Sequence, residues 1–228
     1  MGNRERIRHE SLELFNKYGA ENIGCNKIAA SLGISPGNLY YHFNNKEEII
    51  RSLFNDIERD MNAILLPMQK SQPYPPEESA RNLINWMMLV WRHRFFFGGL
   101  RGLMRNDDVL MERYCKYQSQ SMDLLLKSFT AEIEYLEIVN HPLRKQMLHA
   151  VTTNVWLIAT CWISHLQTIN TYEHLSADML IEGAFQVFAT LFPYLPPERG
   201  QAIVLHLNSK AFKNEIIARE EIERMEPA

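Results

Sequence analysis

Apolar side chains recur every three or four positions along most of this chain, which is the spacing of one face of an α-helix. The longest stripe predicts a helix over residues 46–66, and its apolar members are Ile49, Ile50, Leu53, Phe54, Ile57, Met61, Ile64 and Leu65. A shorter stripe, with Ile7, Phe15 and Tyr18 on one side, predicts a helix over residues 4–18. No segment of useful length alternates in the manner of a β-strand. The pattern therefore predicts an all-α fold.

Beyond a proline-rich loop within residues 67–76, the helical spacing continues to the end of the chain. The predicted helices cover residues 77–97, 100–105, 108–135, 142–169 and 176–192, and one final helix begins near residue 197 and runs into the charged tail. Gly98 and Gly99 are expected to break the first of these helices, because glycine is a poor helix former. Ser176 is expected to cap the helix that follows it.

Residues 33–48 contain several residue types that typically end or begin a helix. Gly33 is expected to end a first short helix, because glycine readily takes the left-handed conformation found at helix ends. Ser35 and Pro36 then begin a second helix, as an N-cap and a first helical residue. Asn45 begins a third, and Glu48 completes a capping box with it. Two short helices joined by a tight turn are the result.

A helix–turn–helix explains this order of signals. Leu39 and Phe43, four residues apart, form the inward side of its second helix. The outward side carries small residues at its start and aromatic or polar donors at its end, so it can approach base edges and reach phosphate oxygens. No acidic residue lies between Glu21 and Glu47. An ordinary helical hairpin with a glycine turn is the alternative interpretation.

The segment LGISPGNLYYHFNNKEEII resembles the signature of the TetR family of bacterial transcription regulators. The resemblance implies an all-α homodimer with a three-helix helix-turn-helix domain over residues 1–50. A larger helical domain for effector binding and dimerisation follows over residues 51–228. The DNA-contacting positions that the resemblance implies are Pro36, Gly37, Asn38, Tyr40, Tyr41 and His42 on the recognition helix, with Lys46 after it.

Two positions depart from the family pattern at the start of the helix before the recognition helix. Gly24 stands where Thr or Ser is usual, and Cys25 stands where Thr or Val is frequent. Asn26 and Lys27 are left as the expected DNA contacts from that helix.

The charge balance restricts how DNA could be bound. The formal net charge is −3, and residues 1–51 contain seven Lys or Arg against six Asp or Glu. Affinity for double-stranded DNA must therefore come from a local patch repeated in a dimer, and not from bulk charge.

The segment VWLIATCWI, at residues 155–163, is apolar on every side, which a helix with one solvated face cannot be. One side is expected to meet the domain core. The other side, together with the next helix, is expected to pair with its copy, so that a homodimer forms through helices 142–169 and 176–192. A membrane-inserted hairpin is disfavoured because Thr152, Asn154 and His165 interrupt the apolar run.

Aromatic residues and methionines of the larger domain are candidates for lining a cavity for a largely apolar effector. They are Trp86, Trp91, Phe95, Met104, Tyr114, Tyr117 and Met122. The same side chains at helical spacing also suit a plain core. Asn154, Cys161 and His165 share one helix side, where they could orient a ligand or form hydrogen bonds at the dimer contact.

Other chemistries lack a sequence signal. The eight His residues show no zinc-site spacing, and no phosphate loop or serine elbow occurs, so no metal, cofactor or catalytic residue is expected. The three Cys residues lie far apart, as expected of reduced thiols in the cytoplasm. The charged N-terminus is unlike a signal peptide, and no apolar run has the length of a membrane span.

The sequence therefore predicts an effector-released repressor that acts as a homodimer on a palindromic operator. Within the same class, an activator or a ligand-independent regulator is the alternative. A helical interaction protein that no longer binds DNA is the alternative from another class.

Overall fold

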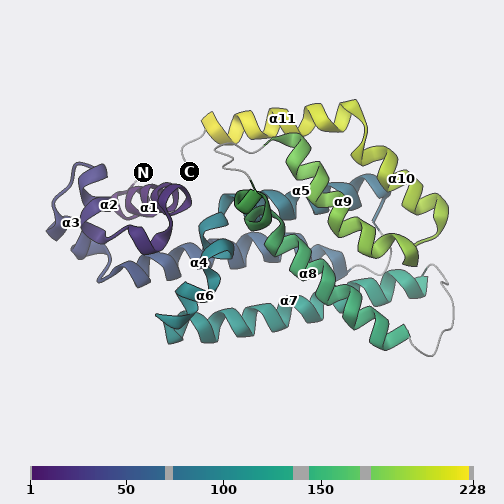
Figure 1. Ribbon diagram of the computed structural model, residues 1–228, viewed down its shortest axis with the longest axis horizontal. Coiled ribbons are helices and arrows are strands. Elements are labelled where there is room, and N and C mark those ends of the chain that lie inside the picture. The colour runs from purple at the N-terminus through teal and green to yellow at the C-terminus, as the bar shows by residue number, and fades with distance from the viewer. Residues whose placement is uncertain (1, 70–73, 136–143, 170–175, 226–228) are drawn as a thin grey trace. The chain divides into compact units, whose positions relative to one another are not determined.

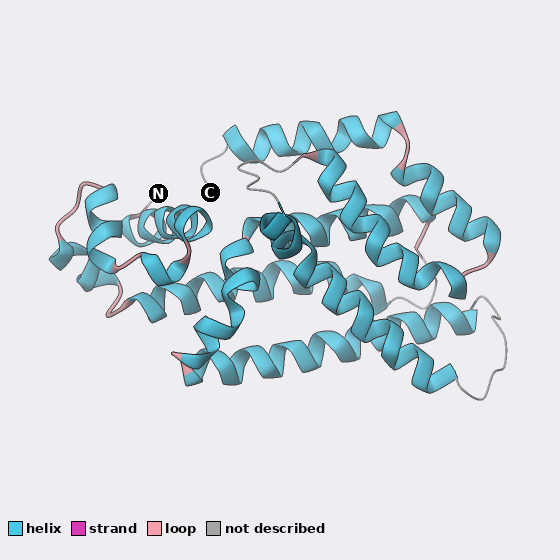
Figure 2. Ribbon diagram, viewed as in Figure 1, coloured by secondary structure: helices cyan, strands magenta, loops and turns pink. Residues whose placement is uncertain are grey.

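The computed structural model describes residues 2–69, 74–135, 144–169 and 176–225. Over these ranges the elements are helices joined by short loops, without a strand (Figure 2), which confirms the predicted all-α fold. The α-helices are α1 (Asn3–Tyr18), α2 (Cys25–Ser31), α3 (Pro36–His42), α4 (Lys46–Leu65), α5 (Pro76–Arg92), α6 (Arg94–Arg105), α7 (Asp108–Tyr135), α8 (Arg144–Ile169), α9 (Ala177–Leu191), α10 (Pro197–Leu207) and α11 (Lys210–Met225). Short 3-10 helices are η1 (Ala20–Asn22), η2 (Leu66–Gln69) and η3 (Phe192–Tyr194). The start predicted at residue 142 for the helix observed as α8 lies outside the described residues.

The chain forms two compact units. The first contains residues up to 60 together with 93–117, and the second contains 61–92 and residues from 118 onward. The first unit therefore takes in α6 and the first turns of α7 in addition to the N-terminal helices. The functional boundary predicted at residue 50 stays a prediction.

Aromatic rings fill the core of the first unit. Phe54 of α4 stacks on Phe96 of α6 with ring centroids 5.1 Å apart, and it lies edge-on to Tyr117 at 5.6 Å. Phe95 lies 5.3 Å from Phe15 of α1. Such pairs add about 0.5–1.5 kcal/mol each beyond their burial. These ring contacts place α6 in the same hydrophobic core as α1 and α4.

The helix break predicted at Gly98 and Gly99 is wrong. The chain turns at His93, between α5 and α6, and both glycines lie inside α6. His93 has φ −111° and ψ 34°, outside helical values. The turn delivers Phe95 and Phe96 to the core of the first unit, and we infer that burying two rings outweighs the helix cost of two glycines, about 1 kcal/mol each.

In the second unit, α8 lies beside α9, and α5 packs against both of them and against α10 (Figure 1). Ser176 accepts a hydrogen bond from the amide of Met179 at 3.3 Å, which confirms the predicted N-cap of α9. Among the described residues, the 147–168 segment of α8 alone is long and apolar enough to cross a membrane. One side of this helix packs on α5 and α9, and the other side is exposed, so that 44% of the apolar window is buried.

The single final helix predicted from residue 197 is wrong. The chain turns at Asn208 and Ser209, between α10 and α11. The Ser209 hydroxyl accepts a hydrogen bond from the amide of Phe212 at 3.2 Å and so caps α11. The turn lets Leu207 and Phe212, on opposite sides of it, both be buried.

Candidate DNA-binding surface and ligand cavity

The turn between α2 and α3 is closed by backbone hydrogen bonds. Gly33 has φ +66°, and its amide donates to the carbonyl of Ala30 at 3.1 Å. The amide of Ile34 donates to the carbonyl of Ala29 at 3.0 Å. This is the Schellman arrangement, which requires a left-handed residue and so favours glycine. The helix stop predicted at Gly33 is confirmed.

Side chains cap the next two helices at the predicted positions. The hydroxyl of Ser35 accepts a hydrogen bond from the amide of Asn38 at 3.2 Å. The Asn45 side chain accepts one from the amide of Glu48 at 2.8 Å. Glu48 in turn accepts from the amide of Asn44 at 2.8 Å, one residue earlier than in a standard capping box.

The helix α3 buries one side and exposes the other. Leu39 and Phe43 are fully buried, as predicted. The exposed residues are Pro36, Gly37, Asn38, Tyr40 and Tyr41, whereas His42 is half-buried. Tyr41 is the most exposed aromatic residue here, at 85%. A Cβ atom added at Gly37 would meet only the Ser35 hydroxyl oxygen, at 3.9 Å, so the surface at the start of α3 is open.

The two lysines of the predicted DNA contact set have internal partners. The ammonium group of Lys46 donates to the carbonyl of Ala20 at 2.7 Å, and two of its three N–H groups are left for other acceptors. The ammonium group of Lys27 lies 4.5 Å above the ring of Tyr18, a cation–π contact. Asn26, directly before Lys27 in sequence, is exposed on α2. Both cations therefore have contacts within the first unit.

At the start of α2, Gly24 provides no side-chain cap. Cys25, the first residue of the helix, is half-buried. Burial, and next the negative charge of Glu47, raise the pKa of the Cys25 thiol. The thiol is therefore a weaker nucleophile at neutral pH than an exposed cysteine.

Arg4 of α1 holds the C-terminal end of α3, a role that sequence reasoning missed. Its guanidinium donates to the carbonyl of His42 at 2.6 Å and lies 4.1 Å above the ring of Phe43. Glu48 of α4 lies 4.0 Å from the same guanidinium. A cation at a helix C-terminus satisfies a terminal carbonyl and complements the helix dipole. The only sequence signal was the charge at the start of the first predicted helix.

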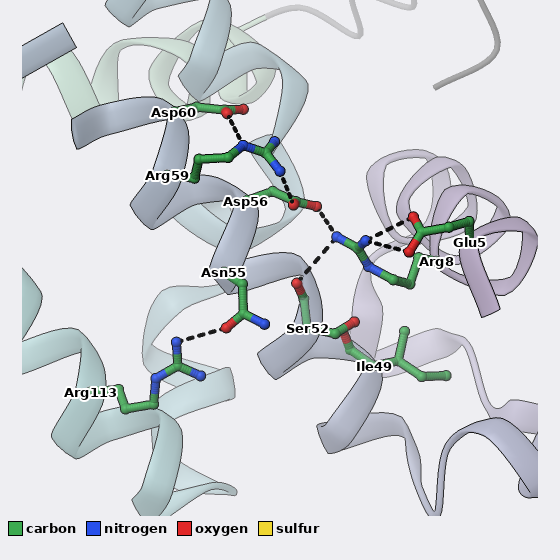
Figure 3. A network of polar contacts seen from close by, with 9 residues as sticks. All are labelled: Glu5, Arg8, Ile49, Ser52, Asn55, Asp56, Arg59, Asp60 and Arg113. Atoms are coloured by element: carbon green, nitrogen blue, oxygen red, sulfur yellow. Dashed lines mark hydrogen bonds and ion pairs between the residues drawn. The ribbon is translucent and has the colours of Figure 1, made fainter. Parts of the chain in front are cut away.

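Figure 3 shows how polar contacts tie α4 to α1 within the first unit. Arg8 of α1 forms ion pairs with Glu5, at 2.8 Å, and with Asp56 of α4. Its guanidinium also donates to the carbonyl of Ser52 at 3.3 Å. Burial raises the pKa of Asp56, although the positive charges of Arg8 and then Arg59 oppose the shift.

A second set of contacts ties α4 to the start of α7 in the same unit. Arg113 donates to the Asn55 side chain at 2.8 Å (Figure 3) and pairs with Glu58 at 2.5 Å. Arg51 pairs at 2.8 Å with the buried Asp107, which also caps α7 by accepting from its backbone. The first part of α4 therefore belongs mechanically to the unit that carries α3.

The second unit contains a partly open cavity of about 90 Å³, bounded by the end of α4 and by residues of η2, α5 and α7 through α10. Its wall is mostly apolar and includes Leu83, Leu125, Phe129, Val151, Val155 and Phe188. The polar side chains on the wall are Tyr74, Ser79, Asn82, Ser128, Glu132 and Tyr194.

Of the ten residues predicted to line a pocket, Trp86 alone lines this cavity. Phe95, Tyr114 and Tyr117 are buried in the first unit, where Met104 is half-buried. Trp91 and Met122 are half-buried in the second unit, and Asn154, Cys161 and His165 are exposed on α8. Periodicity selected apolar and aromatic positions but could not tell a cavity wall from a core.

An exposed second helix after a Schellman turn, with α1 packed against both helices of the motif, is the arrangement of a helix–turn–helix DNA-binding regulator. Residues 7–53 match the family model for bacterial regulatory proteins of the TetR family, and residues 57–203 match the model for a bacterial transcriptional repressor. The chain belongs to the TetR family of transcriptional regulators, which are DNA-binding proteins and not enzymes. The resemblance in the N-terminal motif is thereby confirmed.

Similar proteins support the same assignment. An HTH-type transcriptional regulator of Staphylococcus aureus strain USA300 is 26% identical over 178 residues, covering 68% of this chain and 92% of that protein. Another, from S. aureus strain bovine RF122, is 43% identical over 63 residues, covering 28% of this chain and only 32% of that protein.

Solved structures extend the likeness to most of the chain. The TetR-family regulator from Marinobacter aquaeolei VT8 is 34% identical, with a TM-score of 0.79, over 90% of this chain and 98% of that one. A TetR/AcrR-family regulator from Thermobifida fusca YX-ER1, 18% identical with a TM-score of 0.53, shares the fold over 91% of this chain and 97% of that one.

Proposed function

We propose that the protein is a homodimeric repressor that binds a palindromic operator in the cytoplasm and is released by a small-molecule effector. The exposed face of α3, with its open start at Gly37, is the observation that carries this proposal. The family model matched by residues 57–203 describes repressors, which favours repression over activation. The cavity of the second unit supplies a place for an effector.

On DNA, the exposed residues divide into two roles. Phosphate oxygens would be met by Lys27, Tyr41, His42 and Lys46, and base edges by Asn26, Asn38 and Tyr40. Pro36 and Gly37 would let the start of α3 enter the major groove. Because α3 has only seven residues, each subunit reads few base pairs. Two symmetric copies would read half-sites about 34–36 Å apart, or a multiple of that distance.

The homodimer would form through α8 and α9. The exposed residues Met147, Ala150, Asn154, Leu157, Cys161, His165 and Thr168 recur at helical spacing and so form one stripe along α8. Leu157 is 51% exposed at the middle of this stripe. An apolar residue in that position suits burial against a second subunit. Asn154, Cys161 and His165 would then lie at the dimer contact and not at the ligand.

Leu157→Glu tests the dimer, because it would bury an unpaired charge at the contact, which costs roughly 3–5 kcal/mol. Sedimentation at micromolar concentration should show a wild-type dimer and a variant monomer. Leu205→Glu is the matched control: Leu205 is 71% exposed on α10, outside the proposed contact, so this variant should remain dimeric. A folded wild-type monomer would overturn both the dimer and the two-half-site model.

The repressor itself is tested by selecting a site from random DNA and measuring the protein's affinity for it by gel shift. A reporter driven by a promoter that contains the selected site should become more active when the protein is absent. A palindromic site together with this rise supports repression. Decreased reporter activity would identify an activator, and failure to select any site would show that the helix–turn–helix no longer binds DNA.

A further inference from the structure

One residue in the wall of the second unit's cavity carries a buried hydrogen-bond donor without an acceptor. Trp86 lines the cavity, and its side chain is only 4% exposed. The Nε1–H group of its indole makes no hydrogen bond to any residue that the structure describes. Leaving such a group buried and unpaired is unfavourable, so native proteins rarely do so without a reason. Asn82, one turn earlier on α5, places a side-chain amide on the same wall.

The charges at the cavity are already neutralised within the protein. Glu132 lines the cavity, and Arg199 of α10 donates to its carboxylate at 2.7 Å. The same guanidinium donates to the carbonyl of Tyr74 at 2.7 Å and to the hydroxyl of Ser79 at 3.4 Å. Burial, and next the charge of Glu78, raise the pKa of Tyr74, so its phenol stays uncharged. An ionic ligand would lose its hydration without gaining a free counter-charge.

We propose that the cavity binds a neutral, largely hydrocarbon molecule of about single-ring size, whose one hydrogen-bond acceptor takes the indole N–H of Trp86. The size follows from the volume of about 90 Å³, which is below the roughly 150 Å³ of an apolar cavity that holds benzene. Because the cavity is partly open, a single ring can enter it with its far end directed to the opening. The inference rests on the proposed function, because it names the chemical class of the effector. It goes further by assigning Trp86 as the residue that recognises the acceptor.

Four probes of nine non-hydrogen atoms and nearly equal shape separate the possibilities. Acetophenone is neutral with an acceptor, isopropylbenzene is neutral without one, benzoate is an anion and benzamidinium is a cation. The readout is the set of indole N–H resonances of the ¹⁵N-labelled full-length protein, which contains four Trp residues. The resonance missing from the spectrum of Trp86→Phe identifies Trp86.

Acetophenone should shift the Trp86 indole resonance in the direction of a stronger hydrogen bond, and should bind about two- to tenfold more tightly than isopropylbenzene. Both ions should bind about a hundredfold more weakly than acetophenone, or not at all. Equal affinity for acetophenone and isopropylbenzene, or preferential binding of either ion, would overturn the proposal. So would acetophenone binding that leaves the Trp86 resonance unmoved.

Variants supply the matched control. Trp86→Phe keeps an aromatic ring but removes the donor, so the preference for acetophenone over isopropylbenzene should disappear. Trp162→Phe removes an indole that donates to the carbonyl of Met179 at 3.4 Å and does not line the cavity, so it should keep the preference. If Trp86→Phe does not fold, the relative affinities of the wild-type protein for the four probes still test the proposal.

Operator binding, measured separately, distinguishes this inference from the proposed function. If acetophenone binds as described but leaves operator affinity unchanged, the ligand class stands and effector release by this ligand fails. If the protein binds its operator but none of the probes, or prefers an ionic one, the ligand class fails while DNA binding stands.

Discussion

Gly37 is the position where folding and DNA binding should make opposite demands. It lies in the first turn of α3, where a Cβ atom would have open space apart from Ser35 at 3.9 Å. Its φ is not in the left-handed region, so a larger residue fits without backbone strain. Glycine is about 1 kcal/mol less favourable than alanine inside a helix and less so in a first turn. Gly37→Ala should therefore stabilise the free protein by about 0.5 kcal/mol, or about 1–2 °C in Tm.

DNA binding should change in the opposite direction. A side chain at Gly37 would stand between the start of α3 and the base edges, and Gly37→Leu should do this more than Gly37→Ala. Losing one well-made base contact costs about 1–3 kcal/mol, or about five- to 150-fold in affinity. Fluorescence anisotropy on the selected operator measures the affinity, and a thermal melt of the same sample measures the stability.

Gly102→Ala is the matched control for Gly37. Gly102 lies inside α6 of the same unit, is exposed, and also has open space for a Cβ atom. This variant should gain about 1 kcal/mol of stability, or about 2–4 °C in Tm, with unchanged DNA affinity. If Gly37→Leu bound the operator as tightly as the wild type, Gly37 would not be the point of closest approach to DNA. A large decrease in the Tm of Gly37→Ala would show instead that the folded protein requires glycine at position 37 for its stability.

Three further outcomes are expected. Lys46→Ala should weaken binding to all sequences alike and reduce the slope of log affinity against log salt by about 0.9, the value for one phosphate contact, and an unchanged slope would remove Lys46 from the phosphate contacts. Asn38→Ala, with an exposed side chain, should cost about 1–3 kcal/mol on the best site and relax preference at one base pair. Equal losses on operator and random DNA would place Asn38 in a phosphate role. Cys25, with its raised pKa, should react with iodoacetamide at neutral pH more slowly than the exposed Cys115, which lies outside the proposed dimer contact, as followed by peptide mass spectrometry. Fastest labelling at Cys25 would contradict the burial argument.

The couplings around α4 suggest how an effector could act at a distance. Arg8, Arg51 and Arg113 tie the first part of α4 to α1 and α7 in the unit that carries α3. The same helix continues into the second unit, and its residue Ile64 lines the cavity. We expect reciprocal coupling: the operator should weaken effector binding by the factor by which the effector weakens operator binding. A tight cavity ligand without any effect on DNA affinity would refute this route for that ligand.

The helix–turn–helix could be predicted from sequence because each of its signals is local. Gly33 ends α2 and Ser35 begins α3 through hydrogen bonds that span only a few residues, so residue type and spacing suffice. The buried side of α3, with Leu39, likewise follows from helical periodicity. The all-α fold was predicted in the same way, whereas the turn at His93 and the division of the last predicted helix into α10 and α11 were not.

The tertiary structure decided what depends on distant partners. The rings of Phe95 and Phe96 pack against those of Phe15 and Phe54, and these contacts hold α6 in the first unit. The chain therefore turns at His93 and not at the two glycines. Periodicity marked Trp86 as apolar and inward, but a core and a cavity wall show the same pattern. Only the positions of neighbouring helices determine whether atoms or open space face such a side chain, and whether its N–H group finds an acceptor.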